Sequence, residues 1–83
     1  MKIELNDEKN TVVDLSEVFF IRKSGYMDEE KVRVNRFITR TYSKFIYTIY
    51  IEGKNFTLSV PYGESTNIRN SDYERLKYAF LTK

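Results

Sequence analysis

The sequence contains no cysteine and no histidine, and these two absences exclude much of enzyme chemistry. Without cysteine the chain has neither a disulfide nor a thiolate ligand for zinc, and a small domain without such links is typical of a reducing compartment. We therefore expect a cytoplasmic protein. Without histidine the chain also lacks the commonest general base. The composition predicts a protein that is not an enzyme, with no catalytic residue and no cofactor.

Long hydrophobic runs are also absent. No stretch approaches the roughly 20 apolar residues of a membrane-spanning helix. Residues 1–8 alternate polar and apolar side chains and do not form the apolar segment of a signal peptide, so we expect no membrane partner. The chain has 83 residues, enough for one small core, and we expect a single domain over 1–83.

Several segments have the composition of β-strands separated by turns. Residues 2–5 and 11–15 are rich in Ile, Leu and Val and flank the polar turn 6–10, which predicts a first hairpin. The apolar block 18–22 has the length of a strand buried on both faces, so we place it at the centre of the sheet. Segment 23–30 contains Gly25 and three consecutive acids, and it predicts an exposed loop.

A second hairpin is predicted around Gly53 and Lys54. Gly at the first central position of a two-residue loop is typical of a type II′ turn. Counting outward from this turn pairs Ile51 with Phe56 and Ile49 with Leu58. The resulting core face consists of apolar and aromatic residues only: Phe45, Tyr47, Ile49, Ile51, Phe56, Leu58, Val60 and Tyr62.

The C-terminal segment predicts an amphipathic helix. Ser71 followed by Glu74 has the spacing of a capping box, so we expect the helix to cover about 72–82. Apolar residues then recur at helical spacing, at Tyr73, Leu76, Ala79 and Phe80.

These elements together predict an α+β, mainly β fold: an antiparallel sheet or half-open roll of about five to six short strands with one C-terminal helix. This plan is similar to small pleckstrin-homology-like rolls, a likeness of fold that implies no function. Such rolls usually contain more strands and more residues than this chain. The expected strands are 2–5, 11–15, 18–22, 32–40, 44–52 and 55–61.

The run of residues 31–51 contains five basic side chains and no acid, whereas residues 1–30 have a net charge of −4. Strict alternation along 32–40 would bury Arg36 and Arg40, so we interpret Asn35–Arg36 as a β-bulge that restores the phase. The candidate binding residues are Arg33, Arg36, Arg40, Tyr42, Lys44 and Tyr50.

Three interpretations of this basic strand remain open. Its arginines and tyrosines suit a single-stranded nucleic acid, because the cations contact phosphates and the rings stack on bases. They also suit a protein partner, or a solvated edge strand on which positive charge prevents aggregation. Self-association is a further possibility, since the acidic first third could meet the basic strand of another copy.

We expect a small binding or regulatory protein that docks on a macromolecular partner, with a protein preferred and nucleic acid as the alternative. The triplet Asp28-Glu29-Glu30 lacks the ligand spacing of a calcium loop, so no metal site is predicted. Small size and a composition rich in Lys, Asn, Ile and Tyr suit an accessory protein of a phage or mobile element in an AT-rich bacterium.

Overall fold

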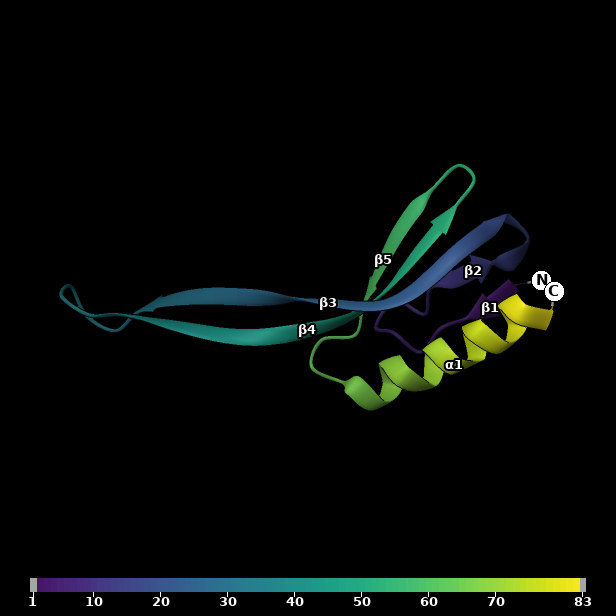
Figure 1. The fold of residues 1–83 in the computed structure, drawn as a ribbon. Coiled ribbons are helices and arrows are strands. Elements are labelled where there is room, and N and C mark those ends of the chain that lie inside the picture. Colours follow the sequence, from purple (N-terminus) through teal and green to yellow (C-terminus); the bar gives the residue numbers. More distant parts are fainter. Residues whose placement is uncertain (1, 83) are drawn as a thin grey trace.

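The computed structural model describes residues 2–82. Its elements follow in the order β1 (Lys2–Glu4), β2 (Val12–Asp14), the short 3-10 helix η1 (Leu15–Glu17), β3 (Val18–Arg33), β4 (Thr39–Gly53), β5 (Thr57–Pro61) and α1 (Thr66–Thr82). The predicted mainly β class with antiparallel strands and a C-terminal helix is confirmed (Figure 1). The predicted single sheet of five to six strands is wrong: β3, β4 and β5 form one sheet, and β1 and β2 form another. The likeness to a pleckstrin-homology-like roll is not confirmed.

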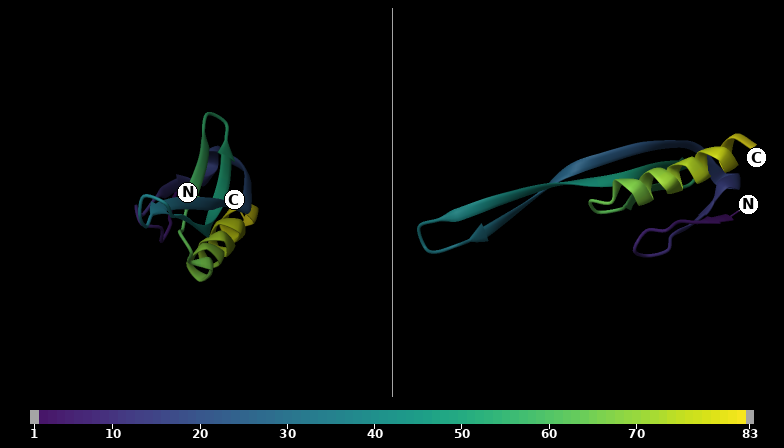
Figure 2. Two further views of the ribbon diagram at one scale, coloured as in Figure 1. Left: turned by 90° about the vertical axis from the view of Figure 1, so that its left-hand side faces the viewer. Right: turned by 90° about the horizontal axis from the view of Figure 1, so that it is seen from below.

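The hairpin of β3 and β4 is far longer than any other part of the sheet. These strands have 16 and 15 residues, whereas β5 has only five. Beyond β5, the hairpin continues as a two-stranded ribbon that projects away from the helix and from β1 and β2 (Figures 1 and 2). The molecule therefore measures 57 × 26 × 18 Å. We call residues 26–46 the arm, and the remaining described residues the body.

The tip of the arm is a turn, at a place where the sequence predicted a β-bulge within a continuous strand. Asn35 Oδ1 accepts hydrogen bonds from the backbone N–H groups of Phe37 (2.8 Å) and Ile38 (2.9 Å). An Asn at the first position of a turn is stabilised in this way. The supposed bulge at Asn35–Arg36 is therefore the turn of the hairpin, and the predicted strand 32–40 is wrong because the chain reverses within it.

Segment 23–30, predicted to be a loop, is strand throughout. Asp28 lies opposite Lys44, and Glu30 lies opposite Tyr42. A strand is recognised in a sequence by alternating apolar and polar residues, which arise when one face of the strand is buried. Both faces of this ribbon meet solvent, so the apolar alternation that marks other strands is missing here.

The hairpin of β4 and β5 has a register two residues away from the predicted one. Ile51 pairs with Leu58 and Ile49 with Val60, because Lys54 and Asn55 form the tip of the loop. A shift of two residues leaves each side chain on its predicted face. Ile49, Ile51 and Val60 are indeed buried, whereas Phe45 and Phe56, predicted in the core, are exposed.

Gly53 has a role other than the predicted one. Among the described glycines only Gly63 has a positive φ, so Gly53 is not the first residue of a type II′ turn. A Cβ atom at Gly53 would overlap the ring of Phe56. Glycine at this position leaves room for the aromatic side chain, which is a packing requirement.

Strand β3 lies at an edge of the sheet, and β4 is the central strand. The prediction that 18–22 forms the buried centre is therefore wrong. Val18 is buried, but Phe19 and Phe20 are 57% and 42% exposed. An edge strand needs only one buried face, and the hydrophobicity of this block misled the assignment.

The first hairpin is confirmed, with Ile3 paired to Val13. Its turn is held by Asp7, which accepts hydrogen bonds from the Thr11 backbone N–H (2.7 Å) and the Thr11 hydroxyl (2.6 Å). Asn10 has φ +50°, a left-handed conformation that Asn tolerates. The hairpin thus follows from local turn chemistry that is visible in the sequence.

Helix α1 begins six residues before the predicted start. The Ser65 carbonyl accepts from the Arg69 N–H at 3.3 Å, which places Ser65 at the N-cap. The capping box at Ser71 is therefore wrong, whereas Leu76 and Ala79 are buried as predicted.

The core comprises Leu5, Val13, Leu15, Val18, Ile49, Ile51, Val60, Tyr62, Leu76 and Ala79. Within residues 2–82, no helix has the length and apolarity needed to cross a membrane.

Candidate binding site

The arm exposes large apolar side chains that the body has no means of covering. Residues 27–45 are exposed without interruption. Phe37 at the tip is 86% exposed and Met27 near the base is 60% exposed. The exposed apolar and aromatic residues of the arm are Tyr26, Met27, Val32, Val34, Phe37, Ile38, Tyr42 and Phe45. Exposed apolar side chains gathered in one region make the arm a candidate interaction surface.

The arm has two faces of different chemistry, because side chains alternate along each strand. Paired residues of β3 and β4 share a face. Face A carries Tyr26, Asp28, Glu30, Val32, Arg40, Tyr42, Lys44 and Ile46. Face B carries Met27, Glu29, Lys31, Arg33, Thr39, Thr41, Ser43 and Phe45.

The six candidate residues named from the sequence do not form one surface. Arg40, Tyr42 and Lys44 share face A, whereas Arg33 lies on face B. Arg36 belongs to the turn, where its guanidinium carbon lies 5.3 Å from the centre of the Phe37 ring.

Tyr50, the sixth candidate, lies in the body. The centre of the Tyr50 ring lies 6.3 Å from the centre of the Phe20 ring and 4.9 Å from the guanidinium carbon of Arg22. Eight residues separate Tyr50 from Tyr42 along the strand, roughly 26 Å at the usual rise. Tyr50 is therefore separate from the arm.

The charges of the arm are arranged in two zones. Asp28, Glu29 and Glu30 lie with Lys44 in the half nearer the body, which has a net charge of −2, while residues 31–41 toward the tip carry four cations and no acid. Asp28 and Glu30 are on one face and Glu29 on the other, so the three carboxylates do not converge. In the part of the chain that the structure describes, no charged side chain of the arm takes part in an ion pair within the molecule.

Two hollows open on the arm or at its base. The larger, of about 500 Å³, lies between the N-terminal turn, the base of the arm and the segment that leads into α1. Its lining includes Asp7, Tyr26, Ile46, Pro61 and Ile68. The smaller, of about 50 Å³, is lined by Asp28, Glu30, Tyr42, Ser43 and Lys44.

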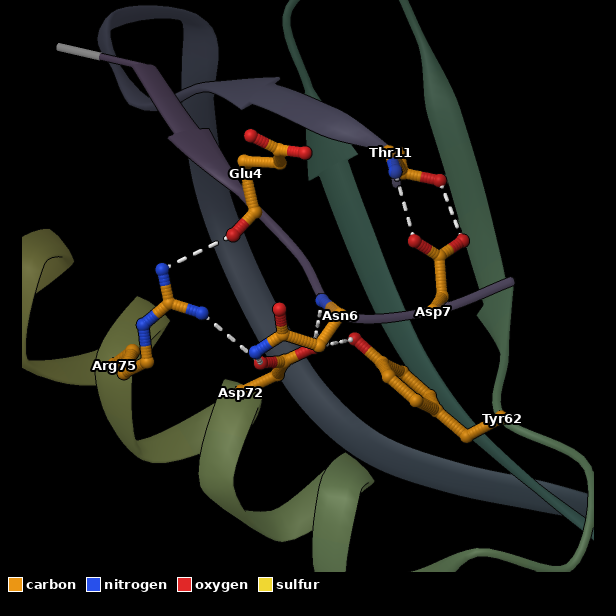
Figure 3. Close-up of polar contacts among 7 residues, drawn as sticks. All are labelled: Glu4, Asn6, Asp7, Thr11, Tyr62, Asp72 and Arg75. Carbon is orange, nitrogen blue, oxygen red and sulfur yellow. Dashed lines mark hydrogen bonds and ion pairs between the residues drawn. The ribbon is translucent and has the colours of Figure 1, made fainter. Parts of the chain in front are cut away.

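Behind the larger hollow, one buried carboxylate joins three segments of the body. Asp72 Oδ2 accepts hydrogen bonds from the Asn6 backbone N–H (2.7 Å) and the Tyr62 hydroxyl (2.8 Å). Its Oδ1 is 3.0 Å from Arg75 Nη1, and Arg75 also donates to the Glu4 carbonyl (Figure 3). Burial and the hydrogen bond to Asp72 raise the pKa of Tyr62 above its ordinary value. The body therefore presents a fixed wall beside the arm.

The base of the arm is attached to the helix by Arg69. Its Nη1 donates to the carbonyls of Ser24 (3.1 Å) and Thr48 (3.4 Å), which belong to paired residues of β3 and β4. The guanidinium carbon also lies 5.0 Å from the centre of the Tyr47 ring. Sequence reasoning missed Arg69 and Asp72, although both occupy the helical stripe that continues back from Leu76.

No protein-family model matches this chain, and neither a curated protein nor a solved structure is significantly similar to it.

Proposed function

We propose that this chain is a small, non-enzymatic docking protein that works in the cytoplasm and binds a partner protein through its arm. The observation that carries the proposal is the continuous exposure of residues 27–45, with large apolar side chains on both faces and at the tip. Its size and composition suit an accessory protein of a phage or mobile element.

A two-stranded ribbon has no interior in which these side chains could be buried. Each buried Å² of apolar surface contributes roughly 25 cal/mol, and this gain is lost while the arm stands in water. A partner that covers the arm recovers it. The intervening charges, among them Glu30 and Arg40, supply the polar rim that gives an interface its specificity.

The attachment of the arm also favours binding. Arg69 bonds both strands at the base, and Gly25 leaves room for the ring of Phe45 where the arm meets the body. A surface that is held before its partner arrives loses less conformational entropy on binding. The arm is therefore suited to insert into a partner as a formed element.

Site-specific photo-crosslinking tests the proposal. A benzophenone amino acid replaces Phe37 in the full chain, which is then irradiated in the cells that produce it. We expect an adduct with one protein of defined mass. The matched control carries the same group at Tyr78, which is 73% exposed on α1 and far from the arm in sequence. No protein adduct at position 37, or the same adduct at both positions, would show that the arm does not dock on a protein.

A single-stranded nucleic acid is the second candidate partner. It is favoured by the four cations of residues 31–41 and by Phe37 at the tip, a ring on which a base could stack. If four cations each contact a phosphate, log affinity should fall against log salt with a slope near −3, roughly fiftyfold between 50 and 200 mM. A response to salt that is flat excludes this candidate.

A further inference from the structure

The order of charges along the arm is complementary to its own reverse. On face A, Asp28, Glu30 and Lys44 occupy the half nearer the body, with a net charge of −1, and Arg40 lies toward the tip. When two arms lie antiparallel with their A faces together, the acidic half of each meets the cationic end of the other. A two-fold axis through the middle of the pair makes both contacts identical, as in most homodimers. A parallel arrangement would bring like charges together.

The distance between the two hollows along the arm matches the distance between Arg40 and Phe37 near its tip. The smaller hollow is lined by two pairs of face A, Asp28 with Lys44 and Glu30 with Tyr42, and the larger one includes the pair Tyr26 and Ile46. The midpoint of the first two pairs lies three residues along β3 from the third pair, about 10 Å at the usual rise. The pairing of Val32 with Arg40 and the turn that contains Phe37 are separated by about the same distance along the ribbon. An antiparallel second arm that places Arg40 at the smaller hollow thus brings Phe37 to the larger.

The chemistry of each hollow suits the side chain that would enter it. The smaller hollow presents the carboxylates of Asp28 and Glu30 beside the ring of Tyr42, and Lys44 in the same lining balances one of the two negative charges. A guanidinium binds such a set through charge-assisted hydrogen bonds and a cation–π contact. The larger hollow offers Ile46 and Ile68, together with Pro61, to an aromatic ring. Its lining also includes Asp7, Glu8 and Lys44, a net charge of −1 that suits the cationic tip that carries that ring.

The size of the contact is also adequate. Face A and the turn 34–38 supply twelve exposed positions on each copy, and the lining of the larger hollow supplies nine more. Stable protein interfaces use about 20–30 residues on each side. For a nucleic acid, by contrast, the acids at 28–30 would lie against phosphates next to the tip.

We propose that the partner of the arm is a second copy of this chain. The two arms lie antiparallel on face A, with Arg40 of each copy in the hollow of Asp28, Glu30 and Tyr42 of the other, and Phe37 in the hollow at the base. This inference rests on the proposed function, that the arm docks on a protein. Each copy supplies residues that complete the binding site of the other.

Sedimentation equilibrium of the full chain and of charge variants tests the dimer. We expect twice the chain mass for the natural sequence, and a dissociation constant raised about tenfold or more by Arg40→Glu or by Glu30→Arg. An equimolar mixture of these two variants should regain the dimer mass, because each supplies the charge that the other lacks. Arg33→Glu, which makes the same charge change on face B, is the matched control and should leave the dimer intact. Circular dichroism establishes that each variant is folded.

Three results would overturn the dimer. The first is that the natural chain remains a monomer at low salt and at the highest concentration reached. The second is that the mixture of the two variants fails to associate. The third is that Arg33→Glu weakens the dimer as much as Arg40→Glu does. The crosslinking at position 37 separates the two proposals. A monomeric chain whose arm crosslinks to a protein of different mass refutes the dimer and retains the docking function, whereas the absence of any protein adduct refutes both.

Discussion

The hydroxyl of Tyr62 donates a 2.8 Å hydrogen bond to Oδ2 of Asp72, joining the segment after β5 to the buried side of α1 (Figure 3). The same carboxylate accepts from Asn6 and Arg75, so the N-terminal turn is tied to the same point. Asp72 is fully buried, and a buried carboxylate is tolerated only with such partners. The body is therefore closed by a polar contact as well as by its apolar core.

Replacing Asp72 with Ala should destabilise the protein by about 3–5 kcal/mol, because the donors of Asn6, Tyr62 and Arg75 lose their acceptor. Urea unfolding followed by circular dichroism measures this loss. Glu74→Ala is the matched control on the exposed side of the same helix and should change the free energy of unfolding by less than about 0.5 kcal/mol. Equal effects of the two changes would contradict a role for the buried carboxylate.

Tyr62→Phe should cost about 1–2 kcal/mol at neutral pH, since it removes one hydrogen bond to a charged acceptor. The raised pKa of Tyr62 also makes its contribution dependent on pH. Above about pH 10 the unfolded tyrosine ionises while the folded one keeps its proton, so unfolding releases a proton and stability falls as pH rises. The difference in free energy of unfolding between the natural chain and Tyr62→Phe should therefore shrink when urea unfolding is measured at alkaline pH. A difference between the two that stays constant up to the alkaline limit would contradict this linkage.

The sequence predicted those elements in which one face is buried. The core face of β4 and the stripe from Tyr73 to Phe80 follow from apolar periodicity, and the first hairpin follows from its polar turn between two apolar segments. The arm did not, because both of its faces meet solvent and its residues show no apolar alternation. Asn35 was the available signal for its turn, since an Asn at this position stabilises the reversal with its own side chain.

The early part of α1 was missed for a different reason. Its buried positions are taken by Arg69 and Asp72, which a hydrophobic pattern assigns to solvent. Their burial depends on acceptors and donors that come from distant parts of the chain, such as Thr48 for Arg69. No local rule identifies such partners, so the start of the helix and the attachment of the arm became visible only in three dimensions.

Arg69→Met should destabilise the protein by about 2–4 kcal/mol, because the carbonyls of Ser24 and Thr48 lose a charged donor near the base of the arm. Arg69→Lys should recover only part of this, since an ammonium cannot reproduce the planar guanidinium over the Tyr47 ring. Urea unfolding of the three proteins gives the comparison. Full recovery by lysine would show that charge alone is needed.

Gly25→Ala should be more harmful than Gly53→Ala. An added Cβ at Gly25 would meet the Phe45 ring and would also lie 2.9 Å from the Ile46 carbonyl oxygen, which is backbone and cannot move away. At Gly53 the three nearest atoms all belong to the Phe56 ring, which is partly exposed and can turn outward. We expect a loss of about 1–3 kcal/mol at Gly25 and less than about 1 kcal/mol at Gly53, measured by thermal and urea unfolding. The reverse order would contradict the role assigned to each glycine.

Removing the arm should leave the body folded. Residues 29–43 are all exposed, so replacing them with Asn-Gly between Asp28 and Lys44 exposes no core residue and supplies a two-residue turn suited to a hairpin. The free energy of unfolding should then stay within about 1 kcal/mol of that of the monomeric full chain, because no residue buried within the chain is lost and loop closure changes little. Urea unfolding and the helical signal in circular dichroism check this. A body that unfolds without its arm would mean that the ribbon serves stability, and its exposed apolar side chains would then no longer indicate a partner.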